Sequence, residues 1–447
     1  MEKFLNLGRT TRVLPISTLA SLVRNFGRKI IPKPVFEFFQ PMYHLTLAYL
    51  AALVYGFPSR KIKVIGVTGT KGKSSTVYFL SRILEEVGYK TAAISTIQFK
   101  IAEKEWPNSL KMTMPGRFAI QSFLAKAVKV GCQFVVLEVS SQGVLQNRHR
   151  FINFDTAVFT KLAPEHIEAH GSFENYKKYK LKFFEYVKNN HIINKDDKYF
   201  QEFYNVPAKN KITYSAGLPA SQAEALRAGD YKNIKLKLWG DFNVANAAAA
   251  VKTAEIYGID AEKSGKILEN IESLPGRMEL IKEGQKFKVI VDYAHTPDSM
   301  EAVYGSLKPK LSARAKLICI FGATGGGRDK WKRPEYGKIA ERYCDEIILT
   351  NEDPYDEKPI SILEQIETGF SLVESVKPAC RTGRSKVHKV LDRKEAIQKG
   401  INLAKEGDIV IITGKGSETT MMVKGGKKIP FDDRQVAREA LKKLQNS

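Results

Sequence analysis

The sequence predicts an α/β protein with three parts: a short helical N-terminal segment, a central P-loop nucleotide-binding domain built on a parallel sheet, and a C-terminal Rossmann-like α/β domain. Three observations support this prediction. An apolar strand at 64–67 runs into a glycine-rich turn and then into a helix with one apolar face. Strand and helix patterns alternate from 61 to about 274, which is typical of a parallel sheet covered by helices on both faces. A second alternating unit follows Pro275-Gly276.

The individual elements follow from apolar runs and helical spacing. In the central unit we expect strands at 63–67, 134–138 and 156–160, and helices at 74–86 and 119–130. In the C-terminal unit we expect strands at 288–292, 315–321, 346–350 and 408–413, with hairpin turns at Gly284-Gln285 and Gly425-Gly426. The predicted domains are therefore 1–61, 62–275 and 276–447.

The bulk composition limits the class of protein. A chain of 447 residues exceeds a single core, and 43% hydrophobic residues are ordinary for a globular protein. The net charge of +23 favours anionic partners. The lysines are scattered, however, and the chain has no zinc-finger or aromatic-interleaved RNA motif, so we expect a generally basic enzyme without a nucleic-acid partner.

The cysteines and the N-terminus bear on the compartment. Four cysteines, Cys132, Cys319, Cys344 and Cys380, stand far apart and form no C-x-x-C pair. This spacing argues against a zinc site and against a disulfide framework, so we expect a reducing cytoplasm. The first residues lack an apolar core followed by a small-residue cleavage site, so no signal peptide is expected.

The segment before the phosphate loop is basic and aromatic. Nine lysines and arginines but only two glutamates occur in residues 1–61, and residues 35–57 are rich in aromatics and leucine. Pro41 is expected to interrupt this stretch, and the part after it is shorter than the ~20 apolar residues of a spanning helix. A helix packed on the next domain is the preferred interpretation. A helix lying on an anionic membrane is the alternative.

The glycine-rich turn is a candidate phosphate-binding loop. Backbone N–H groups and the helix N-terminus behind them would cradle phosphates, Lys73 would reach the outer phosphates, and the Ser74 hydroxyl would bind Mg²⁺. The strict pattern has glycine where this chain has Val67, so the match is to a variant loop. The predicted loop residues are Gly69, Thr70, Lys71, Gly72, Lys73, Ser74 and Ser75.

Polar residues follow the next strands along the chain. Glu138 ends one strand, and Glu165-His166 comes after the following strand. Since the carboxyl ends of parallel strands meet at one edge of a sheet, these residues are expected near the phosphate loop. A carboxylate and an imidazole together suit Mg²⁺ or Mn²⁺, and the sequence therefore predicts a divalent-metal role for Glu138 and His166.

In order along the chain, these pieces resemble the Mur ligases, and the resemblance covers about residues 62 to 435. Within that family the chain is similar to the ligases that add the third residue to a UDP-muramoyl dipeptide. The motifs that carry the resemblance are Gly69-Thr-Lys-Gly-Lys-Ser-Ser75, Glu138-Val-Ser-Ser141, Phe159-Thr-Lys-Leu162, Asn243-x-x-Asn246, Pro275-Gly-Arg-Met-Glu279, Asp292-Tyr-Ala-His-Thr-Pro-Asp298, Gly414-Lys-Gly-Ser-Glu418 and Phe431-Asp-Asp-Arg434.

The resemblance implies ATP-dependent amide bond formation through an acyl phosphate, in peptidoglycan synthesis in the cytoplasm. The partners would be a UDP-muramoyl dipeptide and an amino acid, lysine or another diamino acid. One alternative is a related enzyme that amidates or polyglutamylates a lipid-linked or other γ-carboxylate. Another is a nucleotide-dependent scaffold without catalysis, and the retention of Lys73, Glu138, His166 and Lys180 argues against it.

The resemblance also implies roles for single residues. The catalytic set would be Lys73, Lys180, Glu138 and His166, with Lys180 carbamylated and the metal held by Ser74, Glu138, His166 and that carbamate. The cofactors would accordingly be ATP, Mg²⁺ and the CO₂-derived carbamate. Asn246, Arg277, Asp292 and His295 would complete the ATP site. The substrates would contact Thr113, Ser140, Arg148, Arg328, Asp353, Tyr355, Gly414 and Glu418.

Three departures from the family pattern concern specificity. Tyr355 stands where diaminopimelate-adding members have an arginine, and a tyrosine cannot clamp a carboxylate in a bidentate pair. Met114 replaces a second threonine, and Ser417 replaces a frequent histidine. The sequence also has only some sixty residues before the loop, where members of the family carry a UDP-binding domain. We therefore expect either a reduced UDP site or an acceptor presented differently, on a lipid.

Overall fold

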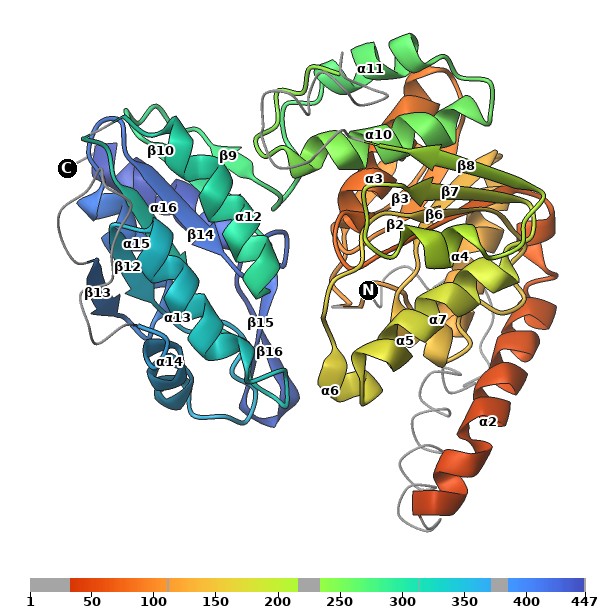
Figure 1. The fold of residues 1–447 in the computed structure, drawn as a ribbon, viewed down its shortest axis with the longest axis horizontal. Helices are drawn as coiled ribbons and strands as arrows, with labels where there is room; N and C mark the ends of the chain where they lie inside the picture. The colour runs from red at the N-terminus through yellow and green to blue at the C-terminus, as the bar shows by residue number, and fades with distance from the viewer. Residues whose placement is uncertain (1–32, 111, 216–233, 313, 371–384, 446–447) are drawn as a thin grey trace, which may run out of the picture.

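A computed structural model describes residues 33–110, 112–215, 234–312, 314–370 and 385–445. Two α/β bodies lie beside each other, and helix α2 (Lys33–Val54) projects from the body that follows it in the chain (Figure 1). The predicted fold class, two parallel-sheet units after a helical segment, is confirmed. The exact domain boundaries stay a prediction.

The central sheet is parallel except at one edge. Its order is β4(Lys104–Pro107)-β3(Gln98–Ile101)-β2(Thr91–Ile94)-β5(Phe134–Glu138)-β1(Lys63–Thr68)-β6(Phe154–Phe159)-β7(Asn190–Asn194)-β8(Asn210–Tyr214). The strands from β2 to β8 pair in parallel, whereas β3 and β4 form an antiparallel extension that the sequence pattern did not predict. The strands expected at 63–67, 134–138 and 156–160 are β1, β5 and β6 within two residues.

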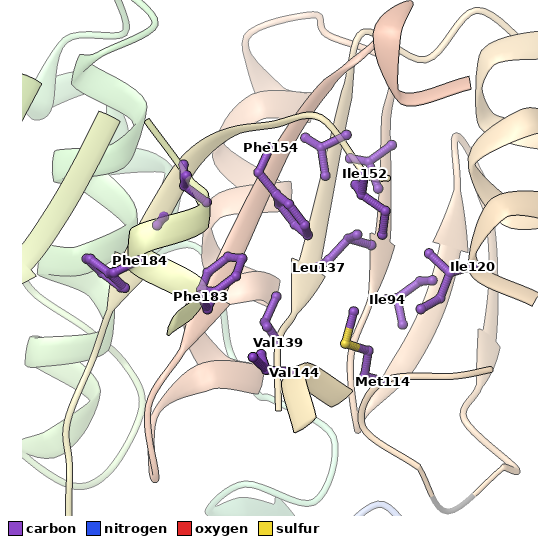
Figure 2. Packing of buried hydrophobic residues seen from close by; sticks show 14 of the residues in the cluster. Ile94, Met114, Ile120, Leu137, Val139, Val144, Ile152, Phe154, Phe183 and Phe184 are labelled. Atoms are coloured by element: carbon purple, nitrogen blue, oxygen red, sulfur yellow. The ribbon is translucent and has the colours of Figure 1, made fainter. Parts of the chain in front are cut away.

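Helices cover both faces of this sheet because successive side chains of each strand point to opposite faces, and apolar side chains lie on both. On one face, α3 (Lys73–Glu86) and α10 (Phe242–Glu255) share a core with Ile65 of β1. On the other face, α4 (Arg117–Lys129) and α7 (Phe173–Tyr186) contribute Ile120 and Phe183 to a second core (Figure 2), which also includes Val64 of β1. Gly66 leaves room for the Phe183 ring, which a Cβ at that position would overlap. The shorter helices are η2 (Pro58–Arg60), α5 (Ser141–Leu145), α6 (Ile167–His170), α8 (Phe200–Tyr204) and α11 (Ala261–Glu269).

The C-terminal sheet has six strands, of which β9 alone is antiparallel to its neighbour. The order is β13(Lys386–Lys389)-β12(Glu346–Leu349)-β11(Leu317–Phe321)-β14(Ile409–Thr413)-β10(Lys288–Asp292)-β9(Glu279–Ile281). Helices α12 (Pro297–Leu307), α13 (Lys332–Tyr343) and α14 (Pro359–Glu367) pack on one face, and α15 (Arg393–Leu403) and α16 (Asp433–Gln445) on the other. Both expected hairpins are present, between β9 and β10 and between β15 (Thr420–Val423) and β16 (Lys427–Pro430).

The structure corrects two expectations. Pro41 does not interrupt the N-terminal stretch, because helix α2 continues through this proline. The Pro41 carbonyl accepts a hydrogen bond from Asn147 Nδ2 at 3.3 Å. Cys319 and Cys344 form a disulfide, so the interpretation that the cysteines stay unpaired is wrong for this pair. The two lie 25 residues apart on β11 and at the end of α13, a separation that only the tertiary fold brings together. Cys380 lies outside the described residues.

One face of α2 packs on the central domain and the other is exposed. Ala48, Ala51 and Ala52 are buried, and the Tyr49 ring meets Phe151 edge-on at 5.3 Å. The preferred packing interpretation therefore holds for this face. The large apolar side chains of α2 that are at least 37% exposed are Phe39, Met42, Tyr43, Tyr49, Leu50, Leu53 and Val54. None of the described helices has the length and apolar character required to cross a membrane. The first 32 residues, with six of the basic side chains noted above, lie outside the described part.

Candidate active site

The glycine-rich loop joins β1 to α3 and is closely packed from behind. Gly69 and Gly72 have φ of +152° and +84°, a region that favours glycine at Gly72 in particular. A Cβ on Gly69 would overlap Thr160 Oγ1, and one on Gly72 would overlap Asn246 Oδ1. Thr70 Oγ1 lies 2.9 Å from the Tyr176 hydroxyl, so the loop is tied to α7 as well. The predicted Asn246 thus lies directly against the phosphate loop.

Two lysines converge on the carbonyl of Gly69. Lys73 Nζ donates to Gly69 O at 3.0 Å and to Thr70 O at 2.8 Å, and Lys180 Nζ donates to Gly69 O at 2.6 Å. Lys180 is only 1% exposed and lies 4.6 Å from the centre of the Tyr176 ring. Burial, reinforced by the charge of Lys73, holds the pKa of Lys180 well below its usual range. Both effects favour the neutral amine of Lys180 relative to an exposed lysine.

The C-terminal domain reaches the loop through Arg277. Its guanidinium stacks over the Tyr293 ring at 4.2 Å, and Nη2 lies 3.5 Å from Ser74 Oγ. Asp292, at the end of β10, is buried and accepts hydrogen bonds from the backbone of Met278 and Ala294 at 2.8 and 2.7 Å. Asp292 consequently fixes the two backbone segments that carry Arg277 and His295.

Glu165 is the electrostatic centre of the junction between the domains. His295 Nε2 and Lys71 Nζ approach Glu165 Oε1 at 3.3 and 3.5 Å, and His166 Nε2 lies 4.0 Å away. Burial opposes ionisation of Glu165, but these basic neighbours outweigh it and hold its pKa well below the usual range. Burial also lowers the pKa of His166 to about 4, so its imidazole is neutral near pH 7. Glu165 belongs to a motif noted in the sequence, but its linking role was not predicted.

Glu138 and His166 both lie at the carboxyl edge of the central sheet. Glu138 Oε2 accepts hydrogen bonds from Thr96 N and Oγ1 at 2.8 and 2.6 Å, and Oε1 is buried without a hydrogen-bond partner. An unpaired carboxylate oxygen and a neutral imidazole are donors that suit a divalent cation. Within the described residues, no group of three or more His, Cys, Asp or Glu side chains forms a ready metal site.

A cavity of about 420 Å³ lies between the two domains. It brings together six predicted residues, Thr113, Ser140, Arg148, His166, His295 and Arg328. The Ser140 hydroxyl accepts the Gly143 N–H and caps α5, while Arg148 donates to Met114 O and, at 2.7 Å, to Gln146 Oε1. The cavity walls also include polar residues that were not predicted as site residues: Ser141, Glu165, Glu168, Asp329, Lys332, Arg333, Tyr336 and Glu352.

The four residues predicted for the incoming amino acid form a second cluster beside this cavity. Lys415, which was not predicted, is buried and donates to Asp353 and Glu418, each at 3.0 Å. A Cβ on Gly414 would overlap the carboxylate of Glu352, and Glu352 is a wall residue of the cavity. Tyr355 packs its ring over Gly326, another wall residue. The cluster is therefore connected to the cavity through Glu352 and Gly326.

Family profiles match most of the chain. The Mur ligase middle domain matches residues 67–254, and the Mur ligase glutamate ligase domain matches residues 276–416. These two matches cover the phosphate loop, Lys180, Arg277 and the junction residues.

Relatives and solved structures agree with this match. A UDP-N-acetylmuramoyl-L-alanyl-D-glutamate–2,6-diaminopimelate ligase of Syntrophomonas wolfei is 38% identical over 414 residues, which cover 89% of this chain and 82% of the relative. A solved structure of a ligase with that name has a TM-score of 0.55 and 30% identity, covering 86% of this chain and 79% of that one. E. coli FolC in complex with DHPP and ADP has a TM-score of 0.65 at 18% identity, covering 98% and 100%, and shares the fold.

Proposed function

This chain belongs to the Mur ligase family, and we propose that it joins an amino acid to UDP-N-acetylmuramoyl-L-alanyl-D-glutamate. Ligases of this family are ATP-dependent and form ADP. The single observation that carries the proposal is the convergence of Arg277 and His295 from one domain on the phosphate loop and Glu165 of the other, beside a cavity of about 420 Å³.

The reaction has two steps. An oxygen of the acceptor γ-carboxylate attacks the γ-phosphorus of ATP, the bond to the β-phosphate oxygen breaks, and ADP leaves. The amine then attacks the acyl carbon of the mixed anhydride, the tetrahedral intermediate expels phosphate, and the nitrogen loses a proton. Both steps concentrate negative charge, so donors fixed around the phosphate loop are the main contribution expected of the protein.

Lys73 and Arg277 supply that positive charge. In the structure Lys73 donates hydrogen bonds to the loop carbonyls of Gly69 and Thr70, and a lysine at this place in a phosphate loop can reach the outer phosphates of a bound nucleotide. Arg277 approaches from the other domain, so its contact near Ser74 depends on the two domains being together. Acyl phosphate formation is thereby coupled to closure, which keeps water from the anhydride.

The divalent ion would be held by Ser74, Glu138, His166 and carbamylated Lys180. Mg²⁺ in that position would neutralise charge on the transferring phosphoryl group. Formation of the carbamate joins the neutral lysine nitrogen to the carbon of CO₂ and releases a proton. Burial, which lowers the pKa of Lys180, favours the neutral amine that this reaction requires. A Lys180 carbamate would give a ¹³C signal after incubation with ¹³C-bicarbonate. Lys180→Ala that retains full activity would exclude this role.

For the amine we propose a diamino acid, bound by the cluster of Asp353, Tyr355, Gly414 and Glu418 with Arg328. The named relatives add diaminopimelate, yet Tyr355 lacks the guanidinium that would clamp a second carboxylate. A test compares ADP release with the UDP-muramoyl dipeptide and lysine, ornithine or diaminopimelate. Release that requires both the dipeptide and one of these amines supports the proposal. No release with any pair would favour a different γ-carboxylate acceptor, such as a lipid-linked one.

We further propose that the enzyme works in the cytoplasm and that α2 rests on an anionic membrane surface. The exposed apolar side chains of α2 and the nine basic residues against two acidic ones in 1–61 favour that contact. Flotation of the full chain with vesicles containing anionic lipid should be lost in a Leu50→Ser/Leu53→Ser variant and at high salt. Flotation that is equal with neutral vesicles, or absent altogether, would contradict the proposal.

A further inference from the structure

Two arginines and a histidine meet where α2 packs against α4. Arg117 is the first residue of α4, and its Nη2 donates a hydrogen bond to the backbone carbonyl of Gln146. Arg148 donates to the side-chain oxygen of the same Gln146, from Nε at 3.2 Å and from Nη2 at 2.7 Å. His44 faces them from α2, where both guanidinium charges act on its imidazole. Gln146 therefore holds two like charges together beside His44.

This cluster has no acidic counterpart among the side chains that the structure describes. Neither arginine forms a salt bridge with a residue in the described part of the chain, and no carboxylate is among the groups that shift the pKa of His44, Arg117 or Arg148. Burial lowers the pKa of Arg117 to about 10, and the charge of Arg148 adds to this shift. Burial likewise lowers the pKa of His44 to about 4. The protein thus keeps an unfavourable concentration of positive charge in a half-buried place.

Several polar atoms of the cluster also lack hydrogen-bond partners among the described residues. Both ring nitrogens of His44 and Nε of Arg117 are buried without a hydrogen bond. Arginines that only fastened the 146–148 turn would be expected to pair their buried donors, because an unpaired buried donor is costly. An anion-binding site instead has these features: unpaired hydrogen-bond donors, positive charges close together, and the N-terminus of a helix, here that of α4.

We propose that His44, Arg117 and Arg148 form a subsite for a phosphate or diphosphate group of the acceptor. Arg148 also lines the cavity between the domains, so the subsite adjoins the place proposed for the acceptor. The inference rests on the proposed function for the identity of the acceptor, whereas the anion site itself is independent of it. Arg117 and His44 then act as specificity-determining residues for the phosphate end of the acceptor.

A phosphate fits the cluster better than a carboxylate does. Two guanidinium groups and an imidazole offer more donors than the two oxygens of one carboxylate can accept, and a diphosphate carries enough charge to offset both arginines. The group could come from a nucleotide-linked or a lipid-linked acceptor, since both carry a diphosphate. The chemistry at the cluster is the same in the two cases, and the kinetic test below separates them.

The anion site is tested by direct binding of inorganic pyrophosphate. Titration calorimetry is carried out with the full chain after the phosphate loop has been saturated with a non-hydrolysable ATP analogue. Arg117→Gln should weaken pyrophosphate binding at least tenfold, whereas Lys129→Gln, on an exposed side chain of the same helix, should leave it unchanged. Equal binding by wild type and Arg117→Gln would overturn the proposal. Thermal unfolding of the free proteins shows whether Arg117→Gln is folded, and relief of like-charge repulsion predicts a Tm no lower than that of Lys129→Gln.

The acceptor end is tested by kinetics with matched substrates. Arg117→Gln should raise KM at least tenfold, with kcat nearly unchanged, for whichever of the UDP-linked and polyprenyl-diphosphate-linked dipeptides is the substrate. The muramoyl dipeptide without any phosphate should be insensitive to the substitution. An equal rise of KM for this truncated acceptor would overturn phosphate recognition. If no acceptor supports ADP release while pyrophosphate binding still depends on Arg117, the proposed function fails and the anion site stands.

Discussion

Replacement of Gly72 by alanine tests how the nucleotide site is built. Gly72 has φ of +84°, and a Cβ there would overlap Asn246 Oδ1 and lie 3.3 Å from Asn246 Cγ. The backbone conformation alone costs about 1–2 kcal/mol for an L side chain. The overlap adds a displacement of Asn246 by about 1 Å to reach ordinary contact distance. We therefore expect Gly72→Ala to lose stability and to move Asn246, which lies against the phosphate loop.

Gly88→Ala is the matched control. Gly88 has φ of +98°, but a Cβ there would meet no atom within 4 Å. Both variants should lose about 1–2 kcal/mol in urea unfolding through the backbone penalty, and Gly72→Ala should lose more because of the overlap with Asn246. Only Gly72→Ala should also weaken ATP binding, at least tenfold, which corresponds to about 1.4 kcal/mol. In the double variant Gly72→Ala/Asn246→Gly, the loss of stability should be smaller than the sum of the losses in the two single variants, since the overlap is removed.

The refuting result is specific. Gly72→Ala that binds ATP as tightly as Gly88→Ala would show that neither the loop backbone at this position nor Asn246 contacts the nucleotide. ATP affinity is measured by equilibrium titration with a fluorescent analogue, so the result does not depend on turnover.

Three further predictions concern stability and specificity. Burial lowers the pKa of His149 from 6.5 to about 3, so the unfolded chain takes up this proton at a higher pH than the folded protein does. The contribution of His149 to the free energy of unfolding is therefore complete above about pH 6.5, and about 2 kcal/mol of it is lost by pH 5. His149→Phe should remove this part of the pH dependence of stability, as measured by urea unfolding across pH 5–7. Arg393→Met should lower the free energy of unfolding by about 3–5 kcal/mol, because it leaves the Asp433 carboxylate buried without the guanidinium that lies 2.7 Å away. A loss below 1 kcal/mol in urea unfolding would contradict this prediction. Tyr355→Arg should raise the ratio of kcat/KM for diaminopimelate to kcat/KM for lysine at least fivefold in an ADP-release assay. The reason is that a guanidinium can bind the second carboxylate of diaminopimelate in a bidentate pair. An unchanged ratio would show that residue 355 does not face the amine substrate.

The elements around the phosphate loop were predictable because their signals are local. The apolar strand, the glycine turn and the amphipathic helix occupy one continuous stretch, and β1 and α3 begin and end within one residue of the expected positions. The same holds for β5 and β10. The order of strands in each sheet has no comparable local signal, because parallel neighbours come from distant parts of the chain.

The features that escaped prediction depend on contacts between distant segments. Pro41 removes one helical hydrogen bond, and the packing of Ala48, Ala51 and Ala52 compensates for that loss only once α2 lies on its domain. The Cys319–Cys344 bond joins a strand to the end of a helix across 25 residues. The spacing of cysteines along the sequence cannot predict such a contact.

The candidate site also has residues that the sequence could predict and residues that it could not. Lys73, Asn246 and Arg277 belong to short motifs, and the structure places all three at the phosphate loop. Glu165 and Lys415 act by linking charges from separate elements, so their roles appear only when the side chains are placed in space. Whether the motif residues perform the predicted chemistry stays a prediction that the experiments above address.

Transfer of oxygen from the acceptor carboxylate to phosphate tests the central claim most directly. The UDP-muramoyl dipeptide is labelled with ¹⁸O in its γ-carboxylate and incubated with ATP, Mg²⁺, the active amine and the enzyme. An acyl phosphate predicts one ¹⁸O atom in each inorganic phosphate released, together with ADP and the amide product, as measured by mass spectrometry. Unlabelled phosphate would contradict the account, because it would mean that ATP is hydrolysed by water and that the carboxylate is never phosphorylated.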